Sequence, residues 1–254
     1  RSEPPTLPSK TSSIKEWSEG IQTYAQNPEF ANQIDYWLRL KNYFVNIPVD
    51  NPSGSNTYAD AEIIENSLSE FETSLLIKNI PQKMEATLVE ILLTALSSVL
   101  CEWSGQPSLL IELYGHGREP IIRDLDVSRT IGWFTSTFPF VLSYENDGFQ
   151  ENLDTIRSQY RRMPNHGIGY NLLRYLTKDA IIHEQMLSIP RPEVNFNFLG
   201  QFDQVGTEAL EHSLTIVPAL EARGHEQYPG NERESKIYVI CTVNAGILQT
   251  YWSY

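Results

Sequence analysis

The chain has 254 residues, of which 41% are apolar and 20% charged, and its formal net charge is −13. This size and composition fit one large globular domain or two small ones with a substantial core. So acidic a chain argues against nucleic acid as a partner, because phosphate binding requires clustered Lys and Arg. No apolar run approaches the roughly 20 residues that span a bilayer, so we expect no membrane partner.

The N-terminal segment and the cysteines indicate where the protein works. Residues 1–12 are rich in proline and polar residues and lack the apolar segment of a signal peptide, so we expect a linker within a longer protein. Cys101 and Cys241 lie far apart within apolar runs, which predicts two buried, reduced thiols. This use of cysteine predicts a cytoplasmic protein.

Helix signals begin directly after the linker. Ser13 is placed to cap a helix whose apolar residues recur at helical spacing from Ile14 to Tyr24, and Asn27-Pro28 restarts a second helix that reaches Lys41. Further helices are predicted after the capping box Ser69–Glu72, and over Met84–Trp103, Phe149–Arg162 and Tyr170–Leu176. The basic group Arg157, Arg161 and Arg162 is interpreted as a solvated helix face.

Strand signals alternate with these helices. Strands are predicted at Glu62–Leu68, Ser108–Tyr114, Thr135–Tyr144 (broken by Pro139), Val194–Phe198, Ser213–Val217, Ile237–Val243 and Ile247–Trp252. The turn Asn244-Ala245-Gly246 joins the last two as a hairpin. The mixed order predicts an α/β layered sandwich, with a mixed sheet flanked by helices.

The most informative stretch is residues 114–119, Tyr-Gly-His-Gly-Arg-Glu, which directly follows a strand. Glycines on both sides leave His116 exposed and allow substrate or backbone to approach closely. Arg118 and Glu119 are able to pair and fix the loop. The residue types leave two interpretations open: a loop at a cleft, or a glycine-rich turn that orders the exit of the strand.

Three further stretches carry weaker signals. Residues 128–139 pass from a turn at Gly132 into a strand with alternating hydroxyls, which suits either a polar channel or an edge strand. Residues 164–170, Pro-Asn-His-Gly-Ile-Gly-Tyr, favour a sharp turn over an anion site. Residues 195–203, Asn-Phe-Asn-Phe-Leu-Gly-Gln-Phe-Asp, predict a strand with aromatic residues in the core.

Taken together, the four stretches resemble in order and spacing the signature motifs of epimerization domains in nonribosomal peptide synthetases, a subtype of the condensation superfamily. Those motifs read approximately Glu-Gly-His-Gly-Arg-Glu, Arg-Thr-Val-Gly-Trp-Phe-Thr, Pro-x-x-Gly-x-Gly-Tyr and Phe-Asn-Tyr-Leu-Gly-Gln-Phe-Asp. The matching segments are residues 114–119, 129–135, 164–170 and 196–203. The resemblance covers nearly the whole chain. It implies a C-terminal lobe like chloramphenicol acetyltransferase at residues 13–254, after a linker at 1–12.

The resemblance also implies partners and a reaction. Substrates would be aminoacyl or peptidyl thioesters on the phosphopantetheine arms of peptidyl carrier domains, with no cofactor bound directly. Other implied partners are the N-terminal lobe of the same domain and a neighbouring adenylation domain. The full-length parent would invert the α-carbon or form a peptide bond. The catalytic His-His-x-x-x-Asp-Gly motif of the N-terminal lobe is absent from this chain, so the chain alone is expected to be inactive.

One departure from the family affects the expected chemistry. Tyr114 stands at the position of the family's catalytic Glu, and a phenol with an ordinary pKa of ~10 is a poor base at neutral pH. Glu112 points the same way from the strand and is a possible substitute. We expect catalytic positions at Tyr114 and His116, a substrate tunnel along Glu112, Arg118, Trp133, Thr135 and Ser136, and no metal site. The alternative is a non-catalytic docking or recruitment module of a synthetase.

Overall fold

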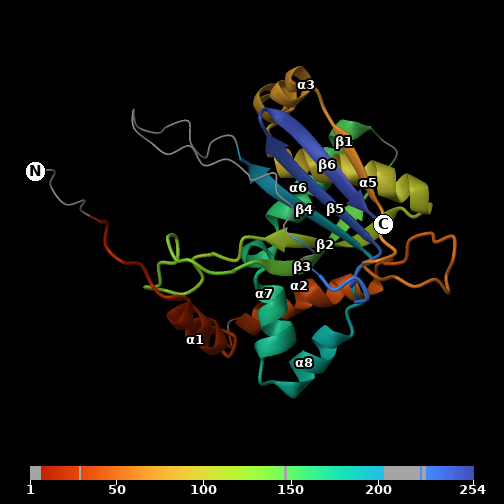
Figure 1. Cartoon of the computed structure of the whole chain (residues 1–254). Helices are drawn as coiled ribbons and strands as arrows, with labels where there is room; N and C mark the ends of the chain where they lie inside the picture. The colour runs from red at the N-terminus through yellow and green to blue at the C-terminus, as the bar shows by residue number, and fades with distance from the viewer. Residues whose placement is uncertain (1–6, 29, 146–147, 203–223, 225–226) are drawn as a thin grey trace, which may run out of the picture. The chain divides into compact units, whose positions relative to one another are not determined.

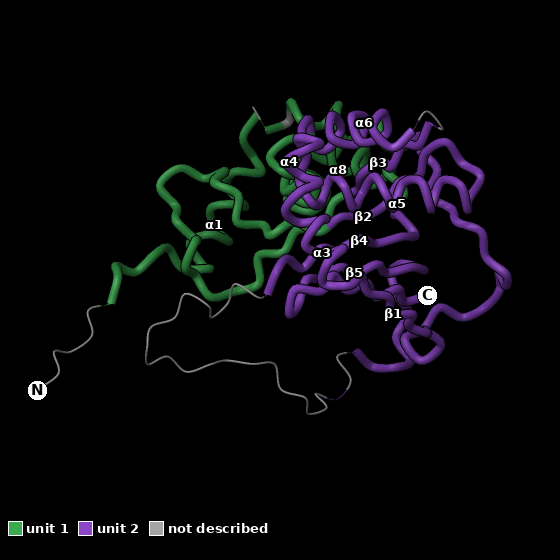
Figure 2. The backbone as a smooth tube through the Cα atoms, turned by 90° about the horizontal axis from the view of Figure 1, so that it is seen from above, with its two compact units in different colours: residues 1–41, 114–138, 163–190 green, residues 42–113, 139–162, 191–254 purple. Residues whose placement is uncertain are grey.

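A computed structural model describes residues 7–28, 30–145, 148–202, 224 and 227–254 (Figure 1). These residues form two compact units that interleave along the chain (Figure 2). Unit 1 comprises residues 1–41, 114–138 and 163–190, and unit 2 comprises residues 42–113, 139–162 and 191–254. The predicted strand Ser213–Val217 and the last residue of the fourth motif, Asp203, lie outside the described residues.

Most of the six-stranded sheet belongs to unit 2, and its strand order is β1-β6-β5-β4-β2-β3. The strands are β1 Ile63–Ser67, β2 Ser108–Gly115, β3 Ser136–Ser143, β4 Val194–Gln201, β5 Ile237–Asn244 and β6 Ile247–Ser253. β6 pairs antiparallel with β1 and β5, whereas β4 pairs parallel with β2 and β5. The predicted mixed sheet with a C-terminal hairpin is therefore confirmed.

Strand β3 differs from the prediction at Pro139. The strand runs through this residue without a break. β3 is the last strand in the sheet order, and an edge strand tolerates proline because its outward N–H has no ladder partner to lose. The predicted interruption at Pro139 is therefore wrong, while its interpretation as a marker of an edge strand is confirmed.

Two long helices of unit 2 pack on each other, α5 Leu88–Ser104 and α6 Phe149–Arg161. The prediction starts α5 too early, at Met84. Glu85 adopts left-handed backbone angles (φ 51°) that end α4 (Ile80–Met84), and Thr87 then forms a reciprocal capping box with Glu90. α3 Glu70–Ser74 joins α4 through a π-helical turn at Leu75–Asn79.

The length and hydropathy of the helices in the described ranges bear on whether they could cross a bilayer. No single helix there is both long and apolar enough to cross a bilayer. The segments Glu70–Met84 and Leu88–Ser104 meet that requirement of length and composition only as a pair, and they are bent by 96° at the break between them.

The basic group on α6 is a tether between helices. Arg161 donates from Nε to Oε1 of Glu90 at 2.8 Å, and Glu90 is only 1% exposed. Arg157 donates to the main-chain oxygens of Met84 and Glu85 at 3.0 and 3.3 Å. The interpretation as a solvated face is therefore wrong for Arg157, whose side chain is 23% exposed, whereas Arg161 stays 55% exposed and in addition pairs with Glu90.

Unit 1 is built from short helices and long loops. Its helices are α1 Ile14–Tyr24, α2 Ile34–Leu38, α7 Gly169–Asn171 and α8 Ala180–Leu187. The predicted cap at Ser13 is present, and the structure adds Glu16 as its reciprocal partner in a capping box. The second predicted helix is broken, because 3-10 turns at Phe30–Gln33 and Arg39–Asn42 flank α2. The core around α1 consists of the buried side chains Trp17, Val127, Phe134 and Ile168.

Candidate functional site

Three of the four motif stretches meet in unit 1 at Gly115, the last residue of β2. A methyl group added to its α-carbon would lie 3.0 Å from Oγ of Ser136 and 3.1 Å from the ring of Phe138. It would also lie 3.6 Å from the carbonyl oxygen of His166, in the third stretch. Contacts of 3.0–3.4 Å are tighter than those that most side chains accept, so glycine permits this convergence.

Gly117 makes an even closer approach to the second stretch. Its φ of +67° lies in the left-handed region, and a β-carbon there would be 1.5 Å from the carbonyl oxygen of Phe134. No side chain fits in that space, so the loop after β2 and the loop before β3 interlock at this glycine.

The side chain of Arg118 holds the same two loops together. Its guanidinium donates to the main-chain oxygens of Val127, Thr130 and Gly132, the latter two at 2.9 and 3.4 Å. It also lies 4.0 Å above the ring of Phe134, a cation–π contact. These acceptors occupy the planar donor fork of arginine, so Arg118 ties the backbone of the second stretch to the first.

His116, in place of the expected Arg118, is the hydrogen-bond partner of Glu119 in this loop. Nδ1 of His116 accepts the backbone N–H of Arg118 at 2.9 Å, and Nε2 lies 3.2 Å from Oε1 of Glu119. Because Nδ1 accepts, the neutral ring carries its hydrogen on Nε2 and donates it to Glu119. Both ring nitrogens are thus engaged within the loop, although the His116 side chain is 66% exposed.

The N-terminal segment, residues 9–13, holds the second stretch from its other side. Ser12 donates its N–H to the carbonyl of Asp126 at 2.7 Å and accepts the N–H of Asp126 on its hydroxyl at 3.2 Å. Thr130 donates its hydroxyl to the carbonyl of Ser12, and Arg129 donates to the carbonyl of Ser9 at 3.1 Å. We call residues 9–13 the strap, because they bind the loop across its length.

This well-anchored loop displays two large apolar side chains. Ile131 is 97% exposed and Trp133 is 83% exposed, while Phe134 is buried. The predicted tunnel residues Thr135 and Ser136 alternate as expected, since Thr135 is exposed and Ser136 is 8% exposed. The structure therefore brings Ser136 against Gly115 and leaves Trp133 in solvent.

The remaining predicted positions lie on β2. Tyr114 and Glu112 are both half-buried, with the buried Leu113 between them, as the alternation of a strand requires. Among the described residues, no group of three His, Cys, Asp or Glu side chains is arranged to hold a metal ion. The sequence reasoning gave neither Val127 nor Phe134 a part in positioning Arg118. Val127 acts through its main-chain carbonyl, which no sequence pattern reveals, whereas the ring of Phe134 lies within the second stretch.

With this geometry in hand, the chain was compared with known proteins. The sequence profile of the condensation domain matches residues 1–234. The chain belongs to the condensation-domain family. It is 35% identical over 253 residues to surfactin synthase subunit 1 of Bacillus subtilis, and 36% identical over 211 residues to gramicidin S synthase 1 of Brevibacillus brevis. These matches cover 98% and 82% of the chain, but only 7% and 19% of the relatives.

Solved structures of this family have the same fold. The epimerization domain from the third module of tyrocidine synthetase B is 30% identical, with a TM-score of 0.86 over 98% of this chain and 55% of that chain. A cyclization-docking bidomain from Sorangium cellulosum, at 17% identity and a TM-score of 0.65, is similar in fold alone and is matched over 48% of its length. The chain thus spans about half of either structure, and its fold is the predicted chloramphenicol acetyltransferase-like α/β fold.

Proposed function

We propose that the chain is one lobe of an epimerization-type domain that acts on aminoacyl or peptidyl thioesters tethered to phosphopantetheine arms of carrier domains. The observation that carries the proposal is the convergence of three epimerization-type stretches around Gly115. The likeness to an epimerization domain supports it, at 30% identity over 98% of the chain. We further propose that the domain works in the cytoplasm beside an adenylation domain and an N-terminal lobe that carries the His-His-x-x-x-Asp-Gly motif.

The proposal divides the site residues into two roles. Tyr114 and Thr135 are proposed to face the substrate, with Glu112 as a second ionisable group on the strand of Tyr114, whereas the buried Ser136 is proposed to support the loop from behind Gly115. His116 and Arg118 are proposed to position the loop, because Glu119, the backbone amide of residue 118 and three carbonyls occupy their polar atoms. Epimerization requires one group to remove the α-proton and another to return a proton on the opposite face. A single lobe supplies at most one side of this exchange.

The reaction of the complete parental domain is tested by α-proton exchange. A carrier-bound aminoacyl thioester is incubated with the domain in deuterated water, and deuterium uptake is measured by mass spectrometry. If racemization was lost at Tyr114, Tyr114→Glu raises the exchange rate at least tenfold, whereas Tyr114→Phe does not. An unchanged rate in Tyr114→Glu would count against this position as the one that decides activity.

The split of the site between lobes is tested on the 254-residue chain by itself. We expect neither condensation nor epimerization of a carrier-loaded substrate, because the His motif is absent from this chain. Turnover by the isolated chain at a rate near that of a related complete domain would refute the split. Loading of the carrier is checked in parallel, so that absence of substrate is not mistaken for absence of activity.

A second candidate, a non-catalytic docking module, has one observation in its favour. Ile131 and Trp133 are exposed on a loop that the strap and Arg118 hold in place, and rigid exposed Trp residues are common anchors of protein interfaces. In this case the complete domain binds a carrier, shows no exchange in any variant at residue 114, and loses binding in Trp133→Ser. Exchange that survives together with carrier binding in Trp133→Ser excludes the docking function.

A further inference from the structure

Helix α5 carries a second apolar stripe besides the one that faces the core. Leu92, Leu96, Val99 and Trp103 follow one another at intervals of four, three and four residues. Leu96 is buried, but Val99 is 55% exposed and Trp103 is 48% exposed. This 4-3-4 interval is the spacing of an apolar helix face, and its exposed half, at Val99 and Trp103, is open to a further packing partner.

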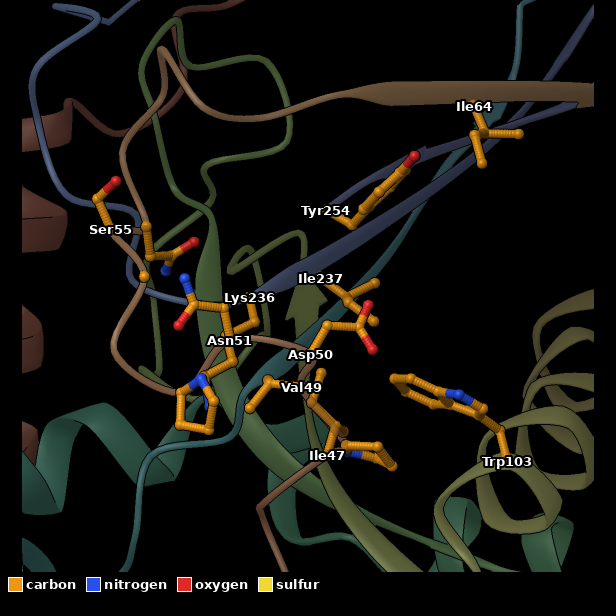
Figure 3. A pocket seen from close by; sticks show the side chains of 14 residues that line it. Ile47, Val49, Asp50, Asn51, Ser55, Ile64, Trp103, Lys236, Ile237 and Tyr254 are labelled. Carbon is orange, nitrogen blue, oxygen red and sulfur yellow. The ribbon is translucent and has the colours of Figure 1, made fainter.

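Two hollows lie along this stripe, both within unit 2. The smaller, of about 150 Å³, is lined by Leu92, Ala95, Leu96, Val99, Phe196, Val239, Cys241, Thr250 and Trp252. The larger, of about 490 Å³, is lined by Trp103, Ile64, Ile237 and Tyr254, together with residues 47–52 and 54–56 and Lys236. In Figure 3 the indole of Trp103 and the side chains of Ile64, Ile237 and Tyr254 surround this larger hollow.

The two hollows are parts of one groove. Three elements line both hollows. On α5, Val99 lines the smaller hollow, and Trp103, one helical turn away, lines the larger one. At the end of β6, Trp252 lines the smaller hollow and Tyr254 the larger one. On β5, Val239 lines the smaller hollow and Ile237 the larger one. The residues of each pair are two apart and therefore lie on the same face of the sheet. We call this continuous feature the α5–β6 groove.

The chemistry of the groove fits a polypeptide better than a small polar ligand. A small-molecule site presents a few convergent polar groups that orient its ligand. Here three of the polar lining groups are engaged within the protein: Asn56 donates to the carbonyl of Arg233, Ser55 to Asp60, and Lys236 pairs with Glu193 at 2.6 Å. Asp50 also lines the larger hollow, where its carboxylate suits a partner with basic residues. What remains available to a ligand is mainly the apolar seam of α5 and the sheet residues opposite.

We propose that the α5–β6 groove binds an amphipathic helix supplied by the same synthetase polypeptide from outside residues 1–254. The stripe from Leu92 to Trp103 rises about 16 Å, which matches three turns of a partner helix with apolar residues at the same 4-3-4 interval. The curated relatives leave ample polypeptide for it, since the chain matches only 7% of the length of surfactin synthase subunit 1 and 19% of gramicidin S synthase 1. This proposal does not depend on the proposed reaction.

The source of the helix is tested by labelling a cysteine introduced with Val99→Cys. The two native cysteines are buried, so the new thiol reports on the groove. In the 254-residue chain the introduced thiol reacts readily with a maleimide, and in the longer parental polypeptide it reacts at least tenfold more slowly. Ile181→Cys on α8, where the native side chain is 69% exposed, is the matched control and reacts equally in both. Equal labelling of Val99→Cys in the two proteins overturns the proposal.

The helical nature of the occupant is tested on the 254-residue chain with a labelled 14-residue peptide. The peptide carries leucines at positions 1, 5, 8 and 12 among Ala, Gln and Lys, and a scrambled peptide of the same composition is the control. The patterned peptide binds and gains helical circular dichroism, and Val99→Glu weakens binding at least tenfold while Ile181→Glu does not. Equal binding of the scrambled peptide refutes a helix, and a dimer that Val99→Glu dissociates assigns the groove to a second copy instead.

Discussion

The ion pair between Glu90 on α5 and Arg161 on α6 sets a measurable share of the stability of unit 2. Glu90 is 1% exposed, and its carboxylate receives Nε and Nη2 of Arg161 at 2.8 and 3.1 Å and the N–H of Thr87 at 2.7 Å. Arg161→Ala removes the charged partner and leaves the buried carboxylate of Glu90 with the backbone N–H of Thr87 as a donor. Losing one partner of a buried pair costs roughly 3–5 kcal/mol, whereas a surface pair contributes about 0–1 kcal/mol.

The expected cost lies between these limits, because the Arg161 side chain is 55% exposed and water screens part of its charge. We expect Arg161→Ala to lower the free energy of unfolding at pH 7 by about 2 kcal/mol, which moves the urea midpoint by about 0.7 M for a slope near 3 kcal/mol/M. Arg162→Ala changes the next, exposed residue and is the matched control, with an expected effect within about 0.5 kcal/mol.

The pH dependence gives the sign of the effect. Burial raises the pKa of Glu90, but the hydrogen bonds and charge of Arg161, with the Thr87 amide, outweigh it and hold the pKa below its ordinary value. The pair therefore stabilises the protein above the unfolded pKa of about 4.3, and this stabilisation is lost as pH falls through the lowered folded pKa. The difference in free energy of unfolding between wild type and Arg161→Ala must therefore be smaller at pH 3 than at pH 7. A difference that persists there, or equal losses in Arg162→Ala, would refute the ion-pair account.

Two further predictions concern the glycine contacts and the thiols. Gly117→Ala is expected to lower the free energy of unfolding by more than about 3 kcal/mol, because the added methyl would meet the carbonyl of Phe134. The control Gly105→Ala, with the same φ of +67° and nothing within 4 Å, is expected to lower it by about 1 kcal/mol. Equal shifts of the melting temperature in the two variants would contradict the steric argument. Burial raises the pKa of Cys101 to about 11 and of Cys241 to about 12, so neither thiol reacts with Ellman's reagent at pH 8 until the chain is unfolded in guanidinium, when two thiols are counted. Rapid native reaction of either thiol would disprove its burial.

Local signals predicted the elements that depend on neighbouring residues. The cap at Ser13 and the capping box at Ser69 locate two helix starts, and the turn Asn244-Ala245-Gly246 locates the hairpin. Helix α8 was missed although Asp179 caps it by accepting the N–H groups of Ile181 and Ile182, because the helix has no clear apolar side. The start of α5 was misplaced because the left-handed turn at Glu85 has no glycine to announce it.

Long-range partners account for what the sequence could not predict. Arg161 belongs to a helix whose spacing indicates a solvated face, and only the fold brings Glu90 within reach. The resemblance to epimerization domains placed Arg118 along a tunnel. The structure shows that Arg118 donates to backbone carbonyls, which every residue carries and no motif reveals. The sequence marked the first three stretches as informative, but it did not predict that they converge at Gly115, because that convergence depends on the fold.

The strap has a mechanical consequence. Ser9 and Ser12 are hydrogen-bonded to the loop at Asp126, Arg129 and Thr130. A pulling force on the residues before Ser9 would therefore act on several of these hydrogen bonds at once. Such a force would act on the loop that carries the exposed Trp133 before it acts on α1, which begins after Ser13. The strap is thereby the part of unit 1 through which a force on the N-terminal residues would act on the loop with the exposed tryptophan.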